Sequence, residues 1–444
     1  MGQPERHPRG LYVLFATEMW ERFSFYSMLA MFTLYLQDPV EGFSWTKAQA
    51  TSLYSNDMMF VYASPLVGGL LADWKLGYRR AVMLGGLFFM AGHLLLSFRS
   101  LAAVYAALTC LVIGNGFFKP NVSTMVGNLY PEGSPLKDRA YNIFYMGINV
   151  GALLAPLTMA WVRSAFGFHP AFAVAAFGMV ISVATLWWFR GLVEDPERQP
   201  RFLADAGAPA RPPSAIDAVP ESKRILALLA IYATVIVFWM VFHQNGSTLT
   251  YWANDNTDWD AVGIGPKARG ILSNAINAAW VIILTFPLIG LWKWLGQWNL
   301  EPSTPMKMVY GMLLTAASFG ILWYAARFGE GSVTGELVGD NRYAFRVSFL
   351  WLIAAYGVVT LGELMLSPMG LSLVSKVAPQ RFRGLMMGGW FVATAIGNKL
   401  TMIGVYWTEW LHSTFFAVMA GAALAAGMVL LVFLRPLKQA MPGV

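Results

Sequence analysis

Three ionisable side chains lie inside one apolar stretch near the start of the chain, TEMWERFSFYSM, which covers residues 17–28. Glu18, Glu21 and Arg22 are spaced so that they share one face of a helix with Tyr26. Two carboxylates one turn apart raise the proton affinity of at least one of them, whereas the neighbouring arginine opposes that change. Small movements could therefore tune protonation, as a proton-coupling site requires. A structural ion-pair cluster that fixes helix packing is the alternative.

Two further charged residues lie deep in apolar segments. Lys119, in GNGFFKPNVS, is expected at the same depth as Glu18 and Arg22, so it can meet the first-helix cluster. Snorkelling to the membrane interface is the alternative for this lysine. Glu363, in TLGELMLSPMGLSL, has Ser367 one turn on and no base at helical spacing, so it is expected to await a cation. Arg22 and Lys119 form a cationic pole and Glu363 forms an anionic pole, and together they complement a small zwitterion.

Aromatic and amide residues in other apolar segments are candidates for the walls of a binding site. Rings could shape pockets and amides could hydrogen-bond a polar ligand, with ordinary packing and interhelical hydrogen bonding as the alternatives. The candidates are Tyr26, Tyr62, Trp239, Trp390, Asn149, Asn274 and Asn277. Asp57 and His93 receive no role from the sequence.

The composition indicates a polytopic membrane protein. Hydrophobic residues make up 57% of the 444 residues and charged residues only 12%, which is too much apolar surface for one or two soluble domains. The single cysteine, Cys110, excludes an intrachain disulfide framework and a cysteine-based metal site. The five histidines are scattered along the chain, so no structural metal is expected.

Hydrophobic segments predict an all-α fold with twelve transmembrane helices, since a hydrocarbon core of about 30 Å needs about 20 helical residues. Their expected limits are 10–36, 46–72, 79–98, 101–129, 139–165, 170–190, 222–251, 266–295, 304–326, 341–376, 380–410 and 412–435. A polar segment rich in Pro and Ala, 191–221, is expected to be a cytoplasmic linker. The chain is therefore predicted to form two six-helix bundles, 1–190 and 222–444.

Lysine and arginine predict the orientation. They are concentrated in the N-terminus, the loops after even-numbered spans, the linker and the C-terminus. The positive-inside rule therefore places both termini in the cytoplasm of a multi-pass inner (plasma) membrane protein. The sequence pI near 9.4 then needs no nucleic acid to explain it.

The two predicted bundles echo one another. PLVGGLLADWKLG from Pro65 recurs in weakened form as PLIGLWKWLG from Pro287, each at the end of the second helix of its half. In the fourth helix of each half, GNGFFKP (114–120) parallels GELMLSP (362–368). Parallel six-helix repeats around a central site are the plan of major facilitator transporters.

Several motifs resemble those of one transporter family. EMWERF resembles the ExxER signature on the first helix of proton-dependent oligopeptide transporters, the peptide branch of the major facilitator superfamily. The other matching motifs follow in the family's order along the chain. They are GGLLADWKLGYRR (68–80), FFKPNVS (117–123), YNIFYMGINVGALL (141–154), FW (238–239), QNGS (244–247) and GELMLSP (362–368).

This resemblance implies uptake of di- and tripeptides coupled to proton entry, by alternating access and without a cofactor other than the proton gradient. Glu18, Glu21, Arg22 and Lys119 would couple the protons. The substrate-binding residues would be Arg22, Tyr26, Tyr62, Lys119, Asn149, Trp239, Asn277, Glu363, Ser367 and Trp390. The protein would bind peptides, protons and the lipid bilayer, would function as a monomer and would not be an enzyme.

The sequence departs from the family at one pair of positions. Many bacterial relatives have an arginine after the first-helix methionine and an acid four residues after the seventh-helix tryptophan, which form an extracellular gate. Leu29 and His243 stand at these positions here, so that ion pair cannot form. Because histidine changes charge near neutral pH, His243 is a candidate for an external gate or proton entry. A satisfied packing histidine is the alternative.

The sequence is also compatible with other functions. Proton-coupled transport of another small solute, such as nitrate, an amino acid or a peptide-like drug, would use the same fold, although Glu363 would repel a simple anion. A membrane-embedded transferase is a second alternative, but no metal-ligand or nucleophile cluster lies beside the buried charges. A pure channel is disfavoured by the repeat and by the coupled charges.

Overall fold

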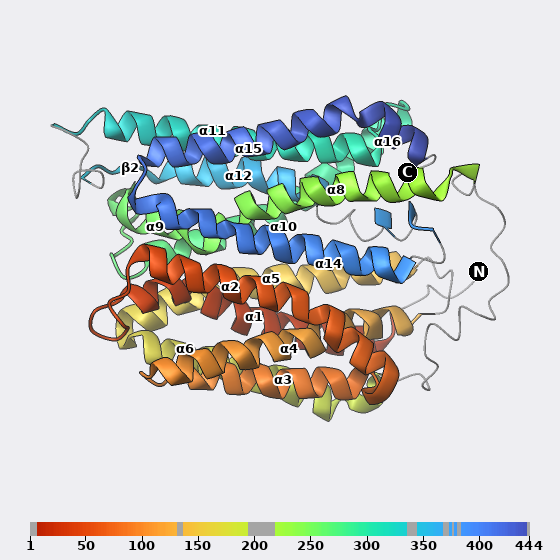
Figure 1. Ribbon diagram of the computed structural model, residues 1–444. Coiled ribbons are helices and arrows are strands. Elements are labelled where there is room, and N and C mark those ends of the chain that lie inside the picture. Colours follow the sequence, from red (N-terminus) through yellow and green to blue (C-terminus); the bar gives the residue numbers. More distant parts are fainter. Residues whose placement is uncertain are drawn as a thin grey trace. The chain divides into compact units, whose positions relative to one another are not determined.

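The computed structural model describes residues 7–130, 136–193, 218–334, 344–366, 373–374, 377–379 and 383–441, and most of them are helical (Figure 1). The chain forms two compact units. Unit 1 comprises Met1–Trp45 and Phe60–Ala210, and unit 2 comprises Thr46–Met59 and Arg211–Val444. Most of the expected linker, 191–221, lies outside the described residues, so the predicted bundle boundaries stay a prediction.

Unit 1 is a bundle of long helices. α1 packs against α5 and α6, and α3 packs against α4 and α6 (Figure 1). The second helix, α2, contributes its first half to unit 2 and its second half to unit 1. The elements are α1 (Arg9–Gln37), α2 (Lys47–Leu71), the π-helical turn η1 (Ala72–Leu76), α3 (Tyr78–Leu95), α4 (Leu101–Asn128), α5 (Leu136–Phe166), α6 (Phe168–Trp188) and η2 (Arg190–Leu192).

Unit 2 is a second helical bundle. α11 packs against α12 and α15, α8 against α14, and α10 against α9 and α12. The helices are α8 (Glu221–Phe242), η4 (His243–Gly246), α9 (Thr248–Asp255), η5 (Asp260–Val262), α10 (Arg269–Gln297), α11 (Thr304–Glu330), α12 (Phe349–Leu366), α14 (Arg383–Leu400), η8 (Thr401–Thr408), α15 (His412–Val432) and α16 (Leu434–Ala440). Two short strands, β1 (Thr257–Asp258) and β2 (Val347–Ser348), pair in parallel.

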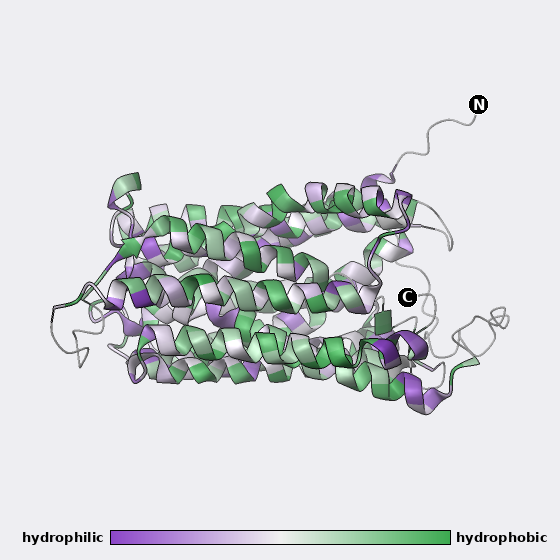
Figure 2. Cartoon of the chain, turned by 90° about the horizontal axis from the view of Figure 1, so that it is seen from above, coloured by the Kyte–Doolittle hydropathy of each residue, from purple (hydrophilic) through white to green (hydrophobic). Residues whose placement is uncertain are grey.

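The helix exteriors are those of a membrane protein. Eight of the described helical segments are long and apolar enough to cross a membrane. α1, α2, α3 and α14, which fall at the other four predicted spans, carry charged residues within their length. Large apolar side chains lie on the surface, such as Phe286 at 64% and Val432 at 72% exposure. Figure 2 shows hydrophobic residues along the helices and hydrophilic residues more often near their ends.

Three predicted spans differ from the structure. The span 341–376 begins too early, because Val347–Ser348 is the strand β2 and α12 starts at Phe349. The span 222–251 is not one helix, because α8 ends at Phe242 and η4 intervenes before α9. A Cβ on Gly246 would lie 2.3 Å from the Tyr54 hydroxyl oxygen, so this break lets the backbone come close to α2. The span 380–410 is helical only to Leu400 and continues as the 3₁₀ segment η8. The strand pair was not predicted, because two residues carry no periodic signal.

Close glycine contacts hold α2 and α4 together in unit 1. A Cβ on Gly68 would lie 2.0 Å from the carbonyl oxygen of Gly116, which is shorter than any real contact of this kind. Only a residue without a side chain fits, as at other small-residue helix crossings in membranes. The crossing lies three residues before Lys119 and therefore helps to fix the position of that lysine.

Candidate functional site

The first-helix charges form one buried cluster in unit 1. Arg22 Nε lies 3.2 Å from Glu18 Oε1, and Arg22 Nη2 donates a hydrogen bond to Glu21 Oε1 at 2.6 Å. Arg22 Nε makes a second, shorter contact with Glu21 Oε2. None of the three residues is more than 4% exposed. The helix spacing therefore predicted their proximity correctly, and a single guanidinium serves two buried carboxylates.

The neighbouring helix α5 packs tightly against this cluster. A Cβ on Gly151 would lie 2.3 Å from Met19 O and 3.1 Å from Arg22 Cβ. The Arg22 guanidinium carbon also lies 5.2 Å from the centre of the Phe25 ring. Close backbone packing on one side and an aromatic ring on another hold the arginine beside its two acids, in surroundings that magnify its charge interactions.

Lys119 of α4 is the second cation of unit 1. Its ammonium lies 4.4 Å from the centre of the Tyr62 ring, in a cation–π arrangement. It interacts electrostatically with Glu18, Glu21 and Arg22, yet has no salt-bridge partner among the described residues. Lys119 therefore belongs to the cluster and keeps a charge that an anionic ligand can use.

Glu363 is the acid that unit 2 contributes. It lies on α12, is half-buried, and accepts a hydrogen bond at Oε2 from the Asn277 amide of α10 at 2.9 Å. The same amide lies 2.9 Å from the Thr360 hydroxyl oxygen. No base forms a salt bridge with Glu363 within the described part of the chain. Ser367, predicted one turn further on, lies outside the described residues.

The remaining candidates have different surroundings. Asn149 donates to Tyr145 O at 2.9 Å within α5. Trp390 is only 6% exposed and packs edge-on against Tyr232, so it belongs to the core of unit 2. The indole nitrogen of Trp239 is buried without a partner among the residues that the structure describes, which leaves one donor for a ligand.

Two more predicted residues take part in contacts between side chains. Tyr26 is half-buried beside Phe25, with ring centres 5.6 Å apart. Asn274 donates to the Thr250 hydroxyl oxygen at 3.2 Å. Neither contact distinguishes a ligand-binding role from helix packing.

His243 begins η4 and is buried. Its Nδ1 contacts Asn398 Oδ1 of α14, and its ring centre lies 4.8 Å from that of Trp239. The packing alternative is therefore well supported, while a gating role stays a prediction. Two residues that the sequence left unassigned, Asp57 and His93, are buried with side-chain polar atoms that lack partners in the described ranges.

A polar seam that the sequence did not reveal joins the first half of α2 to the rest of unit 2. Lys47 Nζ lies 2.6 Å from Asp255 Oδ2 of α9. Ser55 Oγ lies 2.8 Å from Thr401 Oγ1, and Lys399 Nζ contacts Asn56 Oδ1. The partners are about 200 or more residues apart in sequence, which is why helical spacing could not find them.

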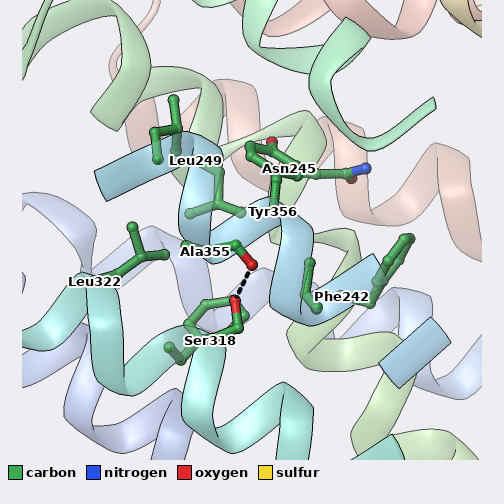
Figure 3. Close-up of a pocket in the computed structure, with 10 residues that line it drawn as sticks. Phe242, Asn245, Leu249, Ser318, Leu322, Ala355 and Tyr356 are labelled. Atoms are coloured by element: carbon green, nitrogen blue, oxygen red, sulfur yellow. Dashed lines mark hydrogen bonds between the residues drawn. The ribbon is translucent and has the colours of Figure 1, made fainter. Parts of the chain in front are cut away.

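Figure 3 shows a hollow in unit 2, between helices that include α11 and α12. Ser318 donates to Ala355 O across it at 2.6 Å, and its lining is mostly apolar. Its volume is about 10 Å³, which admits no more than one water. It is a packing void and not a substrate site.

Known proteins resemble this chain over nearly its whole length. The POT family (PTR2) model matches residues 79–210 and 209–420. A di-/tripeptide transporter of Lactococcus lactis subsp. lactis (strain IL1403) is 31% identical, over 98% of this chain and 96% of that protein. The crystal structure of peptide transporter POT in complex with sulfate has a TM-score of 0.86 at 29% identity, covering 99% of this chain and 98% of that one.

A POT family transporter in complex with 5-aminolevulinic acid also superimposes, with a TM-score of 0.82 at 26% identity and 97% coverage of both chains. The fold and these matches thus define an integral membrane transporter of the major facilitator type. The predicted all-α architecture of twelve transmembrane helices is consistent with it, and eight of the described helical segments are long and apolar enough to cross a membrane. The chain belongs to the POT family.

Proposed function

We propose that this POT-family protein carries di- and tripeptides into the cell together with protons, by alternating access. The observation that carries the proposal is the buried cluster in which Arg22 serves both Glu18 and Glu21, with Lys119 beside it. Charged side chains are energetically costly inside a membrane, so we expect these four to serve a function. The match to a di-/tripeptide transporter supports the class of substrate.

Protonation of one acid changes what Arg22 can bind. With both acids ionised, the guanidinium is engaged by two carboxylates. A proton on Glu18 or Glu21 neutralises one of them, which frees N–H donors and leaves net positive charge at the cluster. The carboxylate of an incoming peptide can then bind Arg22 and Lys119. Loss of the proton restores the original pairs and favours release of the peptide.

Glu363 on α12 is the proposed partner of the peptide ammonium. The peptide ammonium binds Glu363, whose carboxylate Asn277 orients. The buried N–H of Trp239 can meet a peptide carbonyl, and so can the amide of Asn149, which lies on α5 of unit 1. Recognition therefore depends on the two charged ends and the backbone, while Tyr26, Tyr62 and Trp390 shape the surroundings of peptide side chains.

In this proposal the proton gradient and the membrane potential drive transport, and no cofactor does. A membrane potential contributes about 2.3 kcal/mol per charge moved across 100 mV. In this proposal the protein acts as a monomer in the inner (plasma) membrane, with both termini in the cytoplasm. Its ligands are peptides, protons and lipid, with no nucleic acid.

The test of the substrate class is competition by capped peptides. Proteoliposomes are preloaded with unlabelled dialanine, and entry of labelled dialanine is measured in the presence of dialanine, N-acetyl-dialanine, dialanine amide or nitrate. We expect free dialanine to compete and the capped forms and nitrate to compete at least about tenfold more weakly, because each cap removes a charged end. Equal competition by the capped forms would refute recognition of the termini.

A further inference from the structure

An arginine-rich hollow lies in unit 1, away from the first-helix cluster. It has a volume of about 450 Å³ and lies between the start of α3 and the end of α6, which pack side by side. Its charged lining consists of Arg79, Arg80 and Arg190. The transport mechanism proposed above assigns no role to these three residues, two of which end the motif GGLLADWKLGYRR.

In the described part of the chain, the three guanidiniums are not paired with a carboxylate. Arg79 and Arg80 are also the second and third residues of α3, whose first turn contains no acid. A helix begins with free N–H groups and a partial positive charge, so cations there are unfavourable unless an anion is present. The hollow therefore favours an anion.

The other walls of the hollow are apolar. Leu84 and Leu87 continue down the face of α3 that begins at Arg80, and Leu87 is 47% exposed. Trp187, on α6, is 53% exposed, and its ring centre lies 5.4 Å from the Arg190 guanidinium carbon. Tryptophan and arginine beside exposed leucine are typical of the boundary between lipid tails and headgroups. A free inorganic anion would leave these walls uncovered.

We propose that this hollow is a binding site for an anionic phospholipid. The phosphate lies among Arg79, Arg80 and Arg190, where guanidiniums can form paired hydrogen bonds with its oxygens. One acyl chain follows Leu84 and Leu87 along α3. A lipid held in this way bridges the ends of two helices and stabilises unit 1.

The experiment measures lipid binding by the full chain. Purified protein in neutral detergent is titrated with dioleoylphosphatidylglycerol, dioleoylphosphatidylcholine or inorganic phosphate. Tm is recorded, and native mass spectrometry counts the lipids retained. The variants are Arg80→Gln, Arg190→Gln and the double variant. Arg435→Gln, an exposed arginine of α16 in unit 2, is the matched control.

We expect phosphatidylglycerol to raise the Tm of the wild type and of Arg435→Gln by several degrees and to remain bound at one molecule per chain. Each single variant should need about tenfold more of this lipid for the same shift, and the double variant should show none. Phosphatidylcholine or inorganic phosphate giving an equal shift would overturn the proposal. Equal retention of phosphatidylglycerol by the double variant and the wild type would also overturn it.

Discussion

The side-chain amide of Asn277 donates a hydrogen bond to Glu363 Oε2 at 2.9 Å, and this bond joins α10 to α12. An amide orients a carboxylate without neutralising its charge. Glu363 is therefore held in one geometry while its charge stays available for a cation. This relationship separates the acid of unit 2 from those of unit 1, which already share a guanidinium.

Removing the charge of Glu363 should weaken the binding of the peptide ammonium. Glu363→Gln keeps the carbonyl oxygen that Asn277 can bond, so the fold should be retained. The apparent affinity for dialanine should fall about tenfold or more, as expected for a lost charge-assisted hydrogen bond. Counterflow at increasing dialanine concentration measures it, with Glu409→Gln, an exposed acid of the same unit, as control. Unchanged affinity would remove Glu363 from the substrate site.

Lys119 should determine the preference for a free peptide carboxylate. Lys119→Gln removes the cation that lies 4.4 Å from the centre of the Tyr62 ring. We expect the advantage of dialanine over dialanine amide in competition assays to shrink about tenfold. Lys75→Gln, which changes an exposed lysine of η1, should leave this ratio as it is. The assignment is wrong if both variants discriminate equally well.

The crossing of α2 and α4 should not tolerate a side chain. Gly68→Ala places a Cβ about 2.0 Å from Gly116 O, so the helices must separate. Overpacking of this kind costs about 1–3 kcal/mol and should lower Tm. Gly290→Ala of α10 is the matched control, because nothing lies within 4 Å of its Cβ. A Tm of Gly68→Ala equal to that of the control would show that α2 and α4 are not in close contact here.

His243 should contribute to the pH dependence of uptake if it helps external proton entry. His243→Gln retains a hydrogen-bonding group within reach of Asn398 but removes the ionisable ring. The proton-driven uptake profile should flatten between about pH 5 and pH 8, where histidine changes its charge. Initial rates measured at several external pH values, at constant internal pH, test this. A superimposable profile would leave His243 a packing residue only.

Local spacing was enough to predict the first-helix cluster. Glu18, Glu21 and Arg22 lie within one helical turn or so of each other, and the helix alone brings them together. The contact of Asn277 with Glu363 joins residues 86 apart, and only the family resemblance suggested it. Hydropathy identifies the eight described segments that are long and apolar enough to cross a membrane, because membrane thickness fixes the length of a span.

Other features left no local signal. The break between α8 and α9 depends on the approach of Tyr54 to Gly246, which involves a distant part of the chain. The ion pair of Lys47 with Asp255 also has no local sequence signal, since its two residues lie on helices far apart in sequence. Periodicity describes single helices, and such contacts are decided by how several helices pack.

Gradient-driven accumulation of labelled dialanine tests the central claim most directly. Proteoliposomes containing the wild type or Glu21→Gln are assayed with and without an inward proton gradient, and counterflow without a gradient shows that each protein is folded. We predict that the wild type accumulates dialanine only with the gradient, whereas Glu21→Gln exchanges dialanine but does not accumulate it. Two results would contradict proton coupling through the buried acids. One is accumulation by Glu21→Gln equal to that of the wild type, and the other is wild-type accumulation that is the same with and without the gradient.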